Sequence, residues 1–159
     1  MQTQSTVDQI RQRLSGIADI YNRLVLVVGP SGSGRTTALR ALADAEKAPV
    51  LNVGAEISRQ LLDLTERQRA LQLPKLLEDA VAGLPANLTL LDNTEVLFNP
   101  VLRQDPLRLL QGLSRDRTIV ATWLGGVAGG HLTYAVPEHP EFRRYPSADL
   151  LVVCLRQSA

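Results

Sequence analysis

The sequence contains very little cysteine: Cys154 is the only one among 159 residues, which excludes an internal disulfide. Its place in an apolar run from 150 to 155 favours a small core side chain over a nucleophile. No apolar run approaches the roughly 20 residues that span a bilayer, and the first residues lack the charged-then-apolar pattern of a secretory signal. A lone cysteine fits a reducing compartment, so we expect a cytoplasmic protein with no membrane partner.

A strong net charge is also missing, because 17 basic and 16 acidic residues leave only +1 at pH 7. This balance provides no overall attraction to nucleic acid, so direct DNA binding would require oligomerisation. His131 and His139 lack the clustering of a metal site. The length, the 45% hydrophobic share and the 21% charged share predict one globular domain over residues 1–159, without internal repeats.

The most informative stretch is a short apolar run followed by a glycine-rich loop. Residues 24–28 are apolar and mostly β-branched, which predicts a strand buried on both faces, as in parallel sheets. A loop with three glycines follows, and a helical pattern begins near Thr36. Together they match a phosphate-binding loop with the spacing Gly-x-x-x-x-Gly-Arg-Thr. The expected nucleotide-binding residues are Gly29, Pro30, Ser31, Gly32, Ser33, Gly34, Arg35, Thr36 and Thr37.

Each residue type in this loop has a physical role. Glycines let successive N–H groups turn inward around anionic oxygens, and the following helix adds unpaired N–H groups and the positive end of its dipole. Thr36 supplies a hydroxyl for Mg²⁺, which prefers oxygen ligands. Arg35 replaces the usual lysine, and its planar guanidinium can hold phosphates yet miss the position between the β- and γ-oxygens that matters for transfer. Nucleotide binding is therefore better supported than hydrolysis.

A second acidic feature accompanies the loop. Residues 88–91 predict another buried strand, which ends at Asp92, and a carboxylate there can bind Mg²⁺ or its waters together with Thr36. In related ATPases a glutamate follows this aspartate. Here Asn93 follows, and an amide cannot accept a proton from water at neutral pH. The nearest acid is Glu95, which either turns back into the site or has a surface role.

Two further features concern the γ-phosphate. Residues 118–123 predict a further strand, which would lie between the two strands described above if the sheet follows the additional-strand order. Thr122 would then point at the γ-phosphate as a polar sensor, unless it is an ordinary strand-end threonine. Trp123 is either a core residue or a wall of the site. Arg143 and Arg144 lie where oligomeric ATPases of the AAA+ type carry an arginine that reaches a neighbour's nucleotide, the alternative being a charge pair on a loop. The candidate catalytic residues are Arg35, Asp92, Glu95, Thr122, Arg143 and Arg144.

The remaining periodicities predict helices that alternate with strands. Residues 6–21 carry apolar side chains at helical spacing behind a capping box at Thr6, which predicts an amphipathic helix that packs on the domain or binds a partner. A second capping box at Thr65 is expected to start a short turn, and Pro74 to open a separate helix. Glycines between 125 and 130 predict a flexible loop. The other predicted elements are helices at 38–45 and 56–64, strands at 49–53, 131–136 and 150–155, and helical pieces after Asn99 and Asp105.

This alternation predicts the fold class. We expect an α/β, three-layer P-loop NTPase domain of the AAA+ or additional-strand type. Its central sheet would be mainly parallel, with about five strands, and the N-terminal helix within residues 1–21 would pack on it.

Over nearly its whole length the chain also resembles a known family, the BrxF proteins of type 3 BREX bacterial phage-defence systems. The similar segments are the phosphate loop and residues 91–98, 105–107, 114–115, 121–123 and 134–145. The resemblance implies a bacterial cytoplasmic P-loop protein that works beside a DNA methyltransferase, a helicase and a phosphatase-like subunit against phage DNA. Its implied partners are the other defence subunits, with DNA contacted indirectly through the complex.

Four functions remain open at this point. The leading hypothesis is an ATP-binding subunit that acts as an ATPase or nucleotide-dependent switch, with ATP or another NTP and Mg²⁺ as cofactors and a nucleotide-dependent homo-oligomer as its assembly. Arg35 and Asn93 favour instead a scaffold subunit with a degenerate, non-hydrolysing nucleotide site. A small-molecule or nucleotide kinase is a third hypothesis, although no basic lid segment is evident. Direct DNA binding is the fourth.

Overall fold

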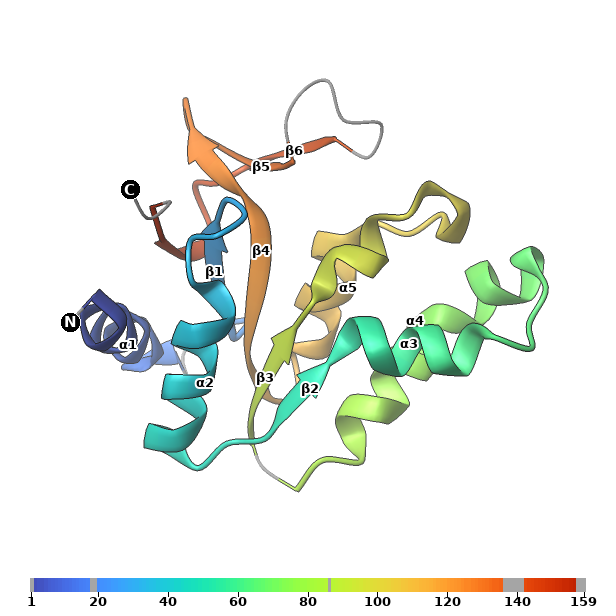
Figure 1. The fold of residues 1–159 in the computed structure, drawn as a ribbon, viewed down its shortest axis with the longest axis horizontal. Helices are drawn as coiled ribbons and strands as arrows, with labels where there is room; N and C mark the ends of the chain where they lie inside the picture. Colours follow the sequence, from blue (N-terminus) through green and yellow to red (C-terminus); the bar gives the residue numbers. More distant parts are fainter. Residues whose placement is uncertain (1, 18–19, 86, 136–141, 157–159) are drawn as a thin grey trace.

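A mainly parallel sheet forms the centre of the protein, as seen in a computed structural model that describes residues 2–17, 20–85, 87–135 and 142–156. Five parallel strands pair in the order β2-β3-β4-β1-β7 (Figure 1). They are β1 (Leu24–Gly29), β2 (Val50–Asn52), β3 (Leu88–Asp92), β4 (Thr118–Ala128) and β7 (Leu151–Cys154). The sequence prediction that β4 lies between β1 and β3 is therefore confirmed.

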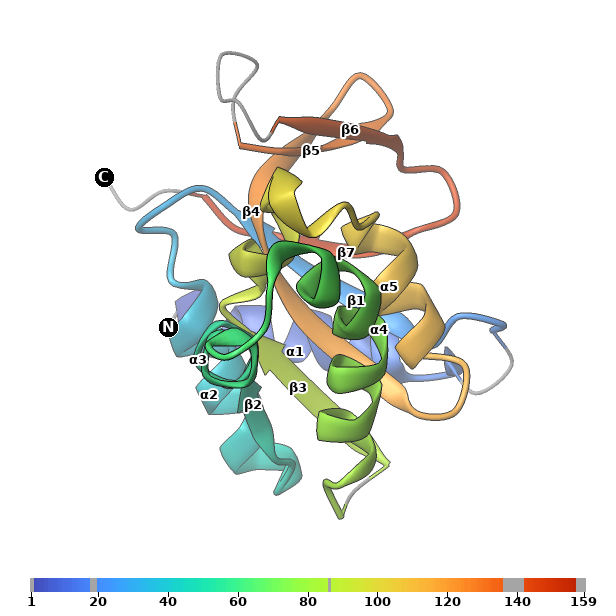
Figure 2. The ribbon, with the colours of Figure 1, turned by 90° about the vertical axis from the view of Figure 1, so that its right-hand side faces the viewer.

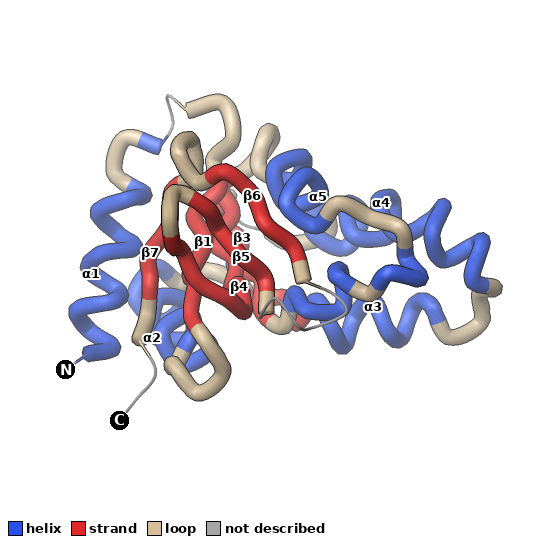
Figure 3. The backbone as a smooth tube through the Cα atoms, turned by 90° about the horizontal axis from the view of Figure 1, so that it is seen from above, coloured by secondary structure: helices blue, strands red, loops and turns tan. Residues whose placement is uncertain are grey.

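Helices cover both faces of this sheet, which gives three layers (Figures 1 and 3). On one face lie α1 (Gln2–Leu14) and α2 (Arg35–Glu46). On the other lie α3 (Val53–Leu61), α4 (Glu66–Ala82) and α5 (Pro106–Leu113). The predicted three-layer α/β fold is confirmed. Within the described part of the chain, no helix is both long enough and apolar enough to cross a membrane.

Strand β1 is buried on both faces, as its unbroken apolar run predicts. Leu24, Leu26 and Val28 pack into the hydrophobic cluster beneath α3, α4 and α5. Val25 and Val27 point the other way, into the cluster beneath α1 and α2. Because alternate side chains of a strand face opposite sides of the sheet, β1 joins the two cores and fixes where the loop after it begins.

The N-terminal helix packs on the domain but differs in its bounds from the predicted 6–21. It begins at Gln2 and ends at Leu14, so Thr6 lies inside the helix and does not cap it. The helix ends because Gly16 adopts a left-handed conformation, with φ of 80°. Tyr21, which was expected to face inward, is 72% exposed. The helix nevertheless packs on the domain as expected, because Val7 and Ile10 of the helix, and Ile17 just after it, are buried in the cluster shared with α2.

Helix α4 is one continuous helix, so the expectation of a separate helix that opens at Pro74 is wrong. The predicted capping box at Thr65 does form, but it starts the whole helix. Pro74 lacks the N–H that would bond the carbonyl of Ala70. Gln104 replaces that donor, because its Nε2 lies 2.7 Å from Ala70 O. A side chain from a different segment thus lets the helix pass through the proline.

The predicted glycine loop at 125–130 is also wrong, because β4 continues to Ala128. It forms a hairpin with β5 (His131–Tyr134), which in turn pairs with β6 (Arg143–Pro146) (Figure 2). Residue 125 must be glycine because the main chain of β5 lies very close to it: a Cβ at this position would lie 1.8 Å from the carbonyl oxygen of Thr133. Only Gly129 and Gly130, both with positive φ, form the turn. His139 and the end of the strand predicted at 131–136 lie outside the described residues.

Smaller differences follow from local capping. Val53 begins α3 rather than ending β2, because the side chain of Asn52 accepts a hydrogen bond from Ala55 N and caps the helix. The predicted caps at Asn99 and Asp105 are confirmed. Two short 3₁₀ helices lie between β3 and Asp105, namely η2 (Thr94–Phe98) and η3 (Pro100–Leu102).

The Gln104 contact generates a stability prediction. Gln104→Leu should lower the free energy of unfolding by about 1–3 kcal/mol, because the partly buried carbonyl of Ala70 loses its donor. Adding Pro74→Ala should recover part of this loss, since it restores an N–H within the helix. Urea unfolding measures both, with Gln72→Leu on the exposed face of α4 as control. Unchanged stability of Gln104→Leu would contradict the assigned role of Gln104.

Candidate functional site

The loop between β1 and α2 is shaped as a phosphate-binding loop. Gly32 and Gly34 take left-handed conformations with φ of 81° and 89°, which only glycine adopts without strain. Ser33 N bonds to Pro30 O at 3.1 Å and closes the turn. Helix α2 then starts at Arg35 with no side-chain cap, since Gly34 is its N-cap residue. The first N–H groups of α2 therefore remain for an anion.

A small cavity of about 140 Å³ lies within this loop, lined by Gly32, Gly34, Arg35, Thr36 and Thr37. These five are among the nine residues predicted to bind nucleotide. Ser33 Oγ is buried and has no hydrogen-bond partner within the described residues. An unpaired buried hydroxyl costs about 1–3 kcal/mol, so an oxygen brought by a ligand or water would stabilise it.

The end of β1 needs glycine for a steric reason. A Cβ at Gly29 would lie 2.3 Å from Ser33 Oγ and 3.0 Å from Ser33 Cβ, so a side chain at residue 29 would force the loop to shift. The first glycine of the motif therefore sets the path of the loop.

Asp92 at the end of β3 is buried and held by β4. Its exposed fraction is 6%, and its Oδ1 accepts hydrogen bonds of 2.9 Å from Thr122 Oγ1 and from Asn93 N. Thr122 is the predicted sensor, and its hydroxyl proton is directed at Asp92. Both bonds use the same carboxylate oxygen. Among the described residues these are the bonds that Asp92 accepts, so its Oδ2 remains for a cation or a water bound to it. While this bond is formed, the Thr122 hydroxyl does not donate to a phosphate.

The donor set fits a magnesium ion. Thr36 offers a hydroxyl at the start of α2, and Asp92 offers a carboxylate oxygen at the same edge of the sheet, where β1 and β3 both end. Mg²⁺ prefers oxygen ligands and usually keeps several waters, so one hydroxyl, one carboxylate and phosphate oxygens suffice. A protein-only cage is not expected, and no cluster of three His, Cys, Asp or Glu occurs in the portion of the chain described.

Glu95 does turn back toward the phosphate loop. Its carboxylate Oε1 lies 3.4 Å from Nη1 of Arg35, in an ion pair whose side chains are 35% and 16% exposed. The reversal starts at Asn93, which adopts a left-handed conformation with φ of 54° directly after β3. Of the two roles left open from the sequence, the structure thus favours contact with the site.

Arg143 and Arg144 lie on strand β6 rather than on a loop. Arg143 Nη2 donates to the main-chain carbonyl of Gln104 at 2.9 Å. The guanidinium of Arg144 lies 3.2 Å from Nδ1 of His131. Arg144 is the exposed member of the pair. Strands β5 and β6 extend beyond the end of the sheet at which β1 and β3 end (Figure 1). A role toward a neighbouring subunit stays a prediction.

Trp123 belongs to the core, not to a wall of the site. It is fully buried and meets the ring of Phe98 edge-on at 5.0 Å between centroids. Phe98 also stacks on Tyr134, 3.5 Å away at an interplanar angle of 6°. Tyr145 completes the cluster, and burial together with the nearby Asp105 carboxylate raises the pKa of its phenol to about 12. The phenol therefore stays protonated at neutral pH and donates to Asp105.

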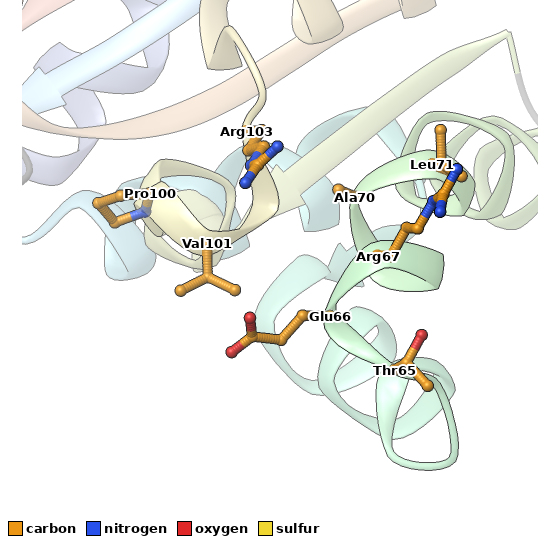
Figure 4. A pocket seen from close by; sticks show the side chains of 8 residues that line it. All are labelled: Thr65, Glu66, Arg67, Ala70, Leu71, Pro100, Val101 and Arg103. Carbon is orange, nitrogen blue, oxygen red and sulfur yellow. The ribbon is translucent and has the colours of Figure 1, made fainter.

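Sequence reasoning missed a broad groove distant from this site. It lies between the start of α4 and η3, with a volume of about 1070 Å³ (Figure 4). Its lining residues are Thr65, Glu66, Arg67, Ala70, Leu71, Pro100, Val101 and Arg103. No motif marks this groove, because its walls come from segments some thirty residues apart and are joined by Gln104.

The strand order and the site define the class of protein. A phosphate loop after β1, an acidic end to β3 and β4 inserted between them form the additional-strand, AAA+-type P-loop NTPase fold. This assignment rests on the topology of the chain itself.

Comparisons with known proteins add only distant likenesses. Among solved structures, the chain is similar to PCH-2 from C. elegans, with 16% identity, a TM-score of 0.48, and coverage of 99% of this chain and 42% of that one. It is also similar to AMPPCP-bound DnaA from Aquifex aeolicus, with 15% identity, a TM-score of 0.42, and coverage of 72% and 36%. The chain thus spans less than half the length of either. No family model and no curated protein matches the sequence.

Proposed function

We propose that this protein is an ATP-binding P-loop subunit of a bacterial anti-phage defence system, where it acts as an ATPase or a nucleotide-dependent switch. The observation that carries the nucleotide proposal is the shaped loop: two left-handed glycines, an uncapped α2 and a small cavity at its start. Such a loop presents N–H groups to anionic oxygens, and phosphate chains are the common ligand of that arrangement.

Different residues of the site would bind the phosphates and the metal ion. Backbone N–H groups between Gly29 and Thr37 would bind the phosphates, and Arg35 adds a positive charge. Thr36 and Asp92 would hold Mg²⁺, which when bound would neutralise phosphate charge. Thr122 keeps Asp92 oriented through its 2.9 Å hydrogen bond, so the carboxylate is ordered before any ligand arrives.

The defence setting is the part of the proposal that rests on sequence resemblance. The similar segments include the phosphate loop and residues 91–98, which lie at or directly beside one end of the sheet. We propose the other BREX subunits as partners, with DNA contacted only through the complex. The nearly neutral charge, +1 at pH 7, supports indirect rather than direct contact with DNA.

A second candidate is a scaffold subunit whose nucleotide site binds without hydrolysis. The observation that favours it is the ion pair between Arg35 and Glu95, which engages the residue that would otherwise serve the phosphates alone. Asn93 adds to this, because an amide in the position after Asp92 can orient a water but cannot take its proton. Turnover separates the two candidates.

Binding is tested by thermal unfolding with nucleotide. Saturating ATP and Mg²⁺ at about 100 times the dissociation constant should stabilise the fold by about 2.7 kcal/mol and raise Tm by about 5–10 °C. Asp92→Ala should abolish the part of this shift that depends on Mg²⁺. If ATP, GTP and their diphosphates all leave Tm unchanged at millimolar concentration, a nucleotide-dependent function is wrong.

Hydrolysis should be slow or undetectable in the isolated chain, because residues 35 and 93 both depart from the pattern of an active ATPase. Arg35→Lys should raise turnover by about tenfold if the phosphate contact alone is deficient, which corresponds to about 1.4 kcal/mol in the barrier. Phosphate release measures this, with Asp92→Ala as the inactive control. Rapid hydrolysis by the unaltered chain would show that neither departure matters.

Assembly is the third test. We propose that Arg144 of one subunit reaches the nucleotide of the next, because it is exposed on β6, beyond the ends of β1 and β3. Such a head-to-tail contact closes a ring or extends a filament. Mass in solution should rise with ATP and Mg²⁺, and Arg144→Ala should weaken the oligomer. Arg143→Ala is less informative, since it also removes a bond to Gln104. A monomer in every nucleotide state would exclude a trans-acting arginine.

A further inference from the structure

The ion pair between the phosphate loop and η2 has a consequence for which nucleotide the site selects. Arg35 occupies the loop position whose side chain reaches the β- and γ-phosphates in this class of site. In this structure its guanidinium already has an anionic partner, the carboxylate of Glu95 at 3.4 Å. A terminal phosphate would have to share Arg35 with that carboxylate or displace it.

The backbone that carries Glu95 is held on both sides. Thr94 is fully buried, and its Oγ1 donates to the carbonyl of Thr122 at 2.6 Å. Phe98, at the other end of η2, is fixed between the rings of Tyr134 and Trp123. Because both ends are anchored, Glu95 can leave Arg35 by rotation of its side chain, while a shift of η2 would disturb the aromatic cluster.

Electrostatics then distinguishes nucleotides by their phosphate number. A carboxylate within reach of Arg35 repels a nearby phosphate, and partial burial of both side chains limits screening by solvent. A nucleoside triphosphate adds its γ-phosphate where this repulsion acts, whereas a diphosphate ends at the β-phosphate. Competition for Arg35 also affects the β-phosphate, so both nucleotides carry a cost, and the added charge of the γ-phosphate makes this cost larger for the triphosphate.

We propose that Glu95 is a specificity-determining residue that disfavours a γ-phosphate, so the site binds nucleoside diphosphate more tightly than triphosphate until Glu95 rotates away from Arg35. This inference rests on the nucleotide site proposed above and deepens it. It assigns to Glu95 a role in ligand selection, which is distinct from proton transfer. A subunit built this way holds diphosphate at rest and accepts triphosphate when something else engages Glu95.

Calorimetric titration with two probes, Mg·ADP and the non-hydrolysable analogue Mg·AMPPCP, tests the proposal. Unaltered protein should bind Mg·ADP more tightly. Glu95→Gln removes the charge at nearly constant size, so it should tighten Mg·AMPPCP by about tenfold and Mg·ADP by less than about threefold. Glu95→Asp keeps the charge and should retain the preference for diphosphate. Glu66→Gln, an exposed carboxylate in the first turn of α4, should change neither affinity.

The outcomes separate this inference from the nucleotide site itself. If the unaltered protein binds both probes and Glu95→Gln shifts both equally or neither, selection by Glu95 is wrong while nucleotide binding stands. If neither probe binds to the unaltered protein or to Glu95→Gln, the nucleotide site is wrong and the inference fails with it. Binding of Mg·AMPPCP only after Glu95→Gln would support both. Thermal melts of each variant check that folding is retained.

Discussion

The position of β4 between β1 and β3 is the constraint on which the site depends. Pairing on both edges of β4 brings the loop that follows β1 and the carboxylate that ends β3 to one end of the sheet. The same strand provides Thr122, whose hydroxyl orients Asp92, and Trp123, whose ring supports η2. A single strand thus positions the Asp92 carboxylate and the segment that carries Glu95, and it continues into the hairpin with β5.

Hydrogen bonds to and from Gln104 connect the parts that lie outside the sheet. The side-chain amide of Gln104 donates to Ala70 O in α4 and to Leu102 O in η3. Its main-chain carbonyl accepts a hydrogen bond from Arg143 on β6. One residue therefore connects α4, η3 and β6. Since η3 follows η2 directly in the chain, this junction also restricts how far the segment of Glu95 can move.

Sequence reasoning succeeded where the signal is local and failed where the cause is distant. The strand at 24–28, the phosphate loop and the caps at Thr65 and Asp105 each depend on neighbouring residues, and all formed as expected. The continuity of α4 past Pro74 depends on a donor thirty-odd residues away. The extension of β4 to Ala128 depends on pairing with β5. The glycines between 125 and 130, taken alone, predict a flexible loop instead.

In the candidate site, too, the sequence predicts the features that local residues determine and misses those that depend on distant ones. The motif identifies the residues of the loop, because backbone geometry within a few residues creates the anion cradle. The pairing of Arg35 with Glu95 spans sixty positions and depends on a single left-handed residue, Asn93. Neither the separation nor the backbone conformation is evident from the spacing of acidic residues.

The charge at residue 35 finally links selection to chemistry. A competing anion or a movement of the glutamate would break the pair between Arg35 and Glu95. A γ-phosphate is such an anion, and the guanidinium has five donors, enough to contact phosphate and carboxylate together. If triphosphate binds while Glu95 still contacts Arg35, the Glu95 carboxylate would lie close to the γ-phosphate. Asn93, in the position after Asp92, cannot act as a base. The same residue that opposes triphosphate is therefore the nearest candidate to orient a water once triphosphate is bound, so weak binding and slow turnover would have one physical origin.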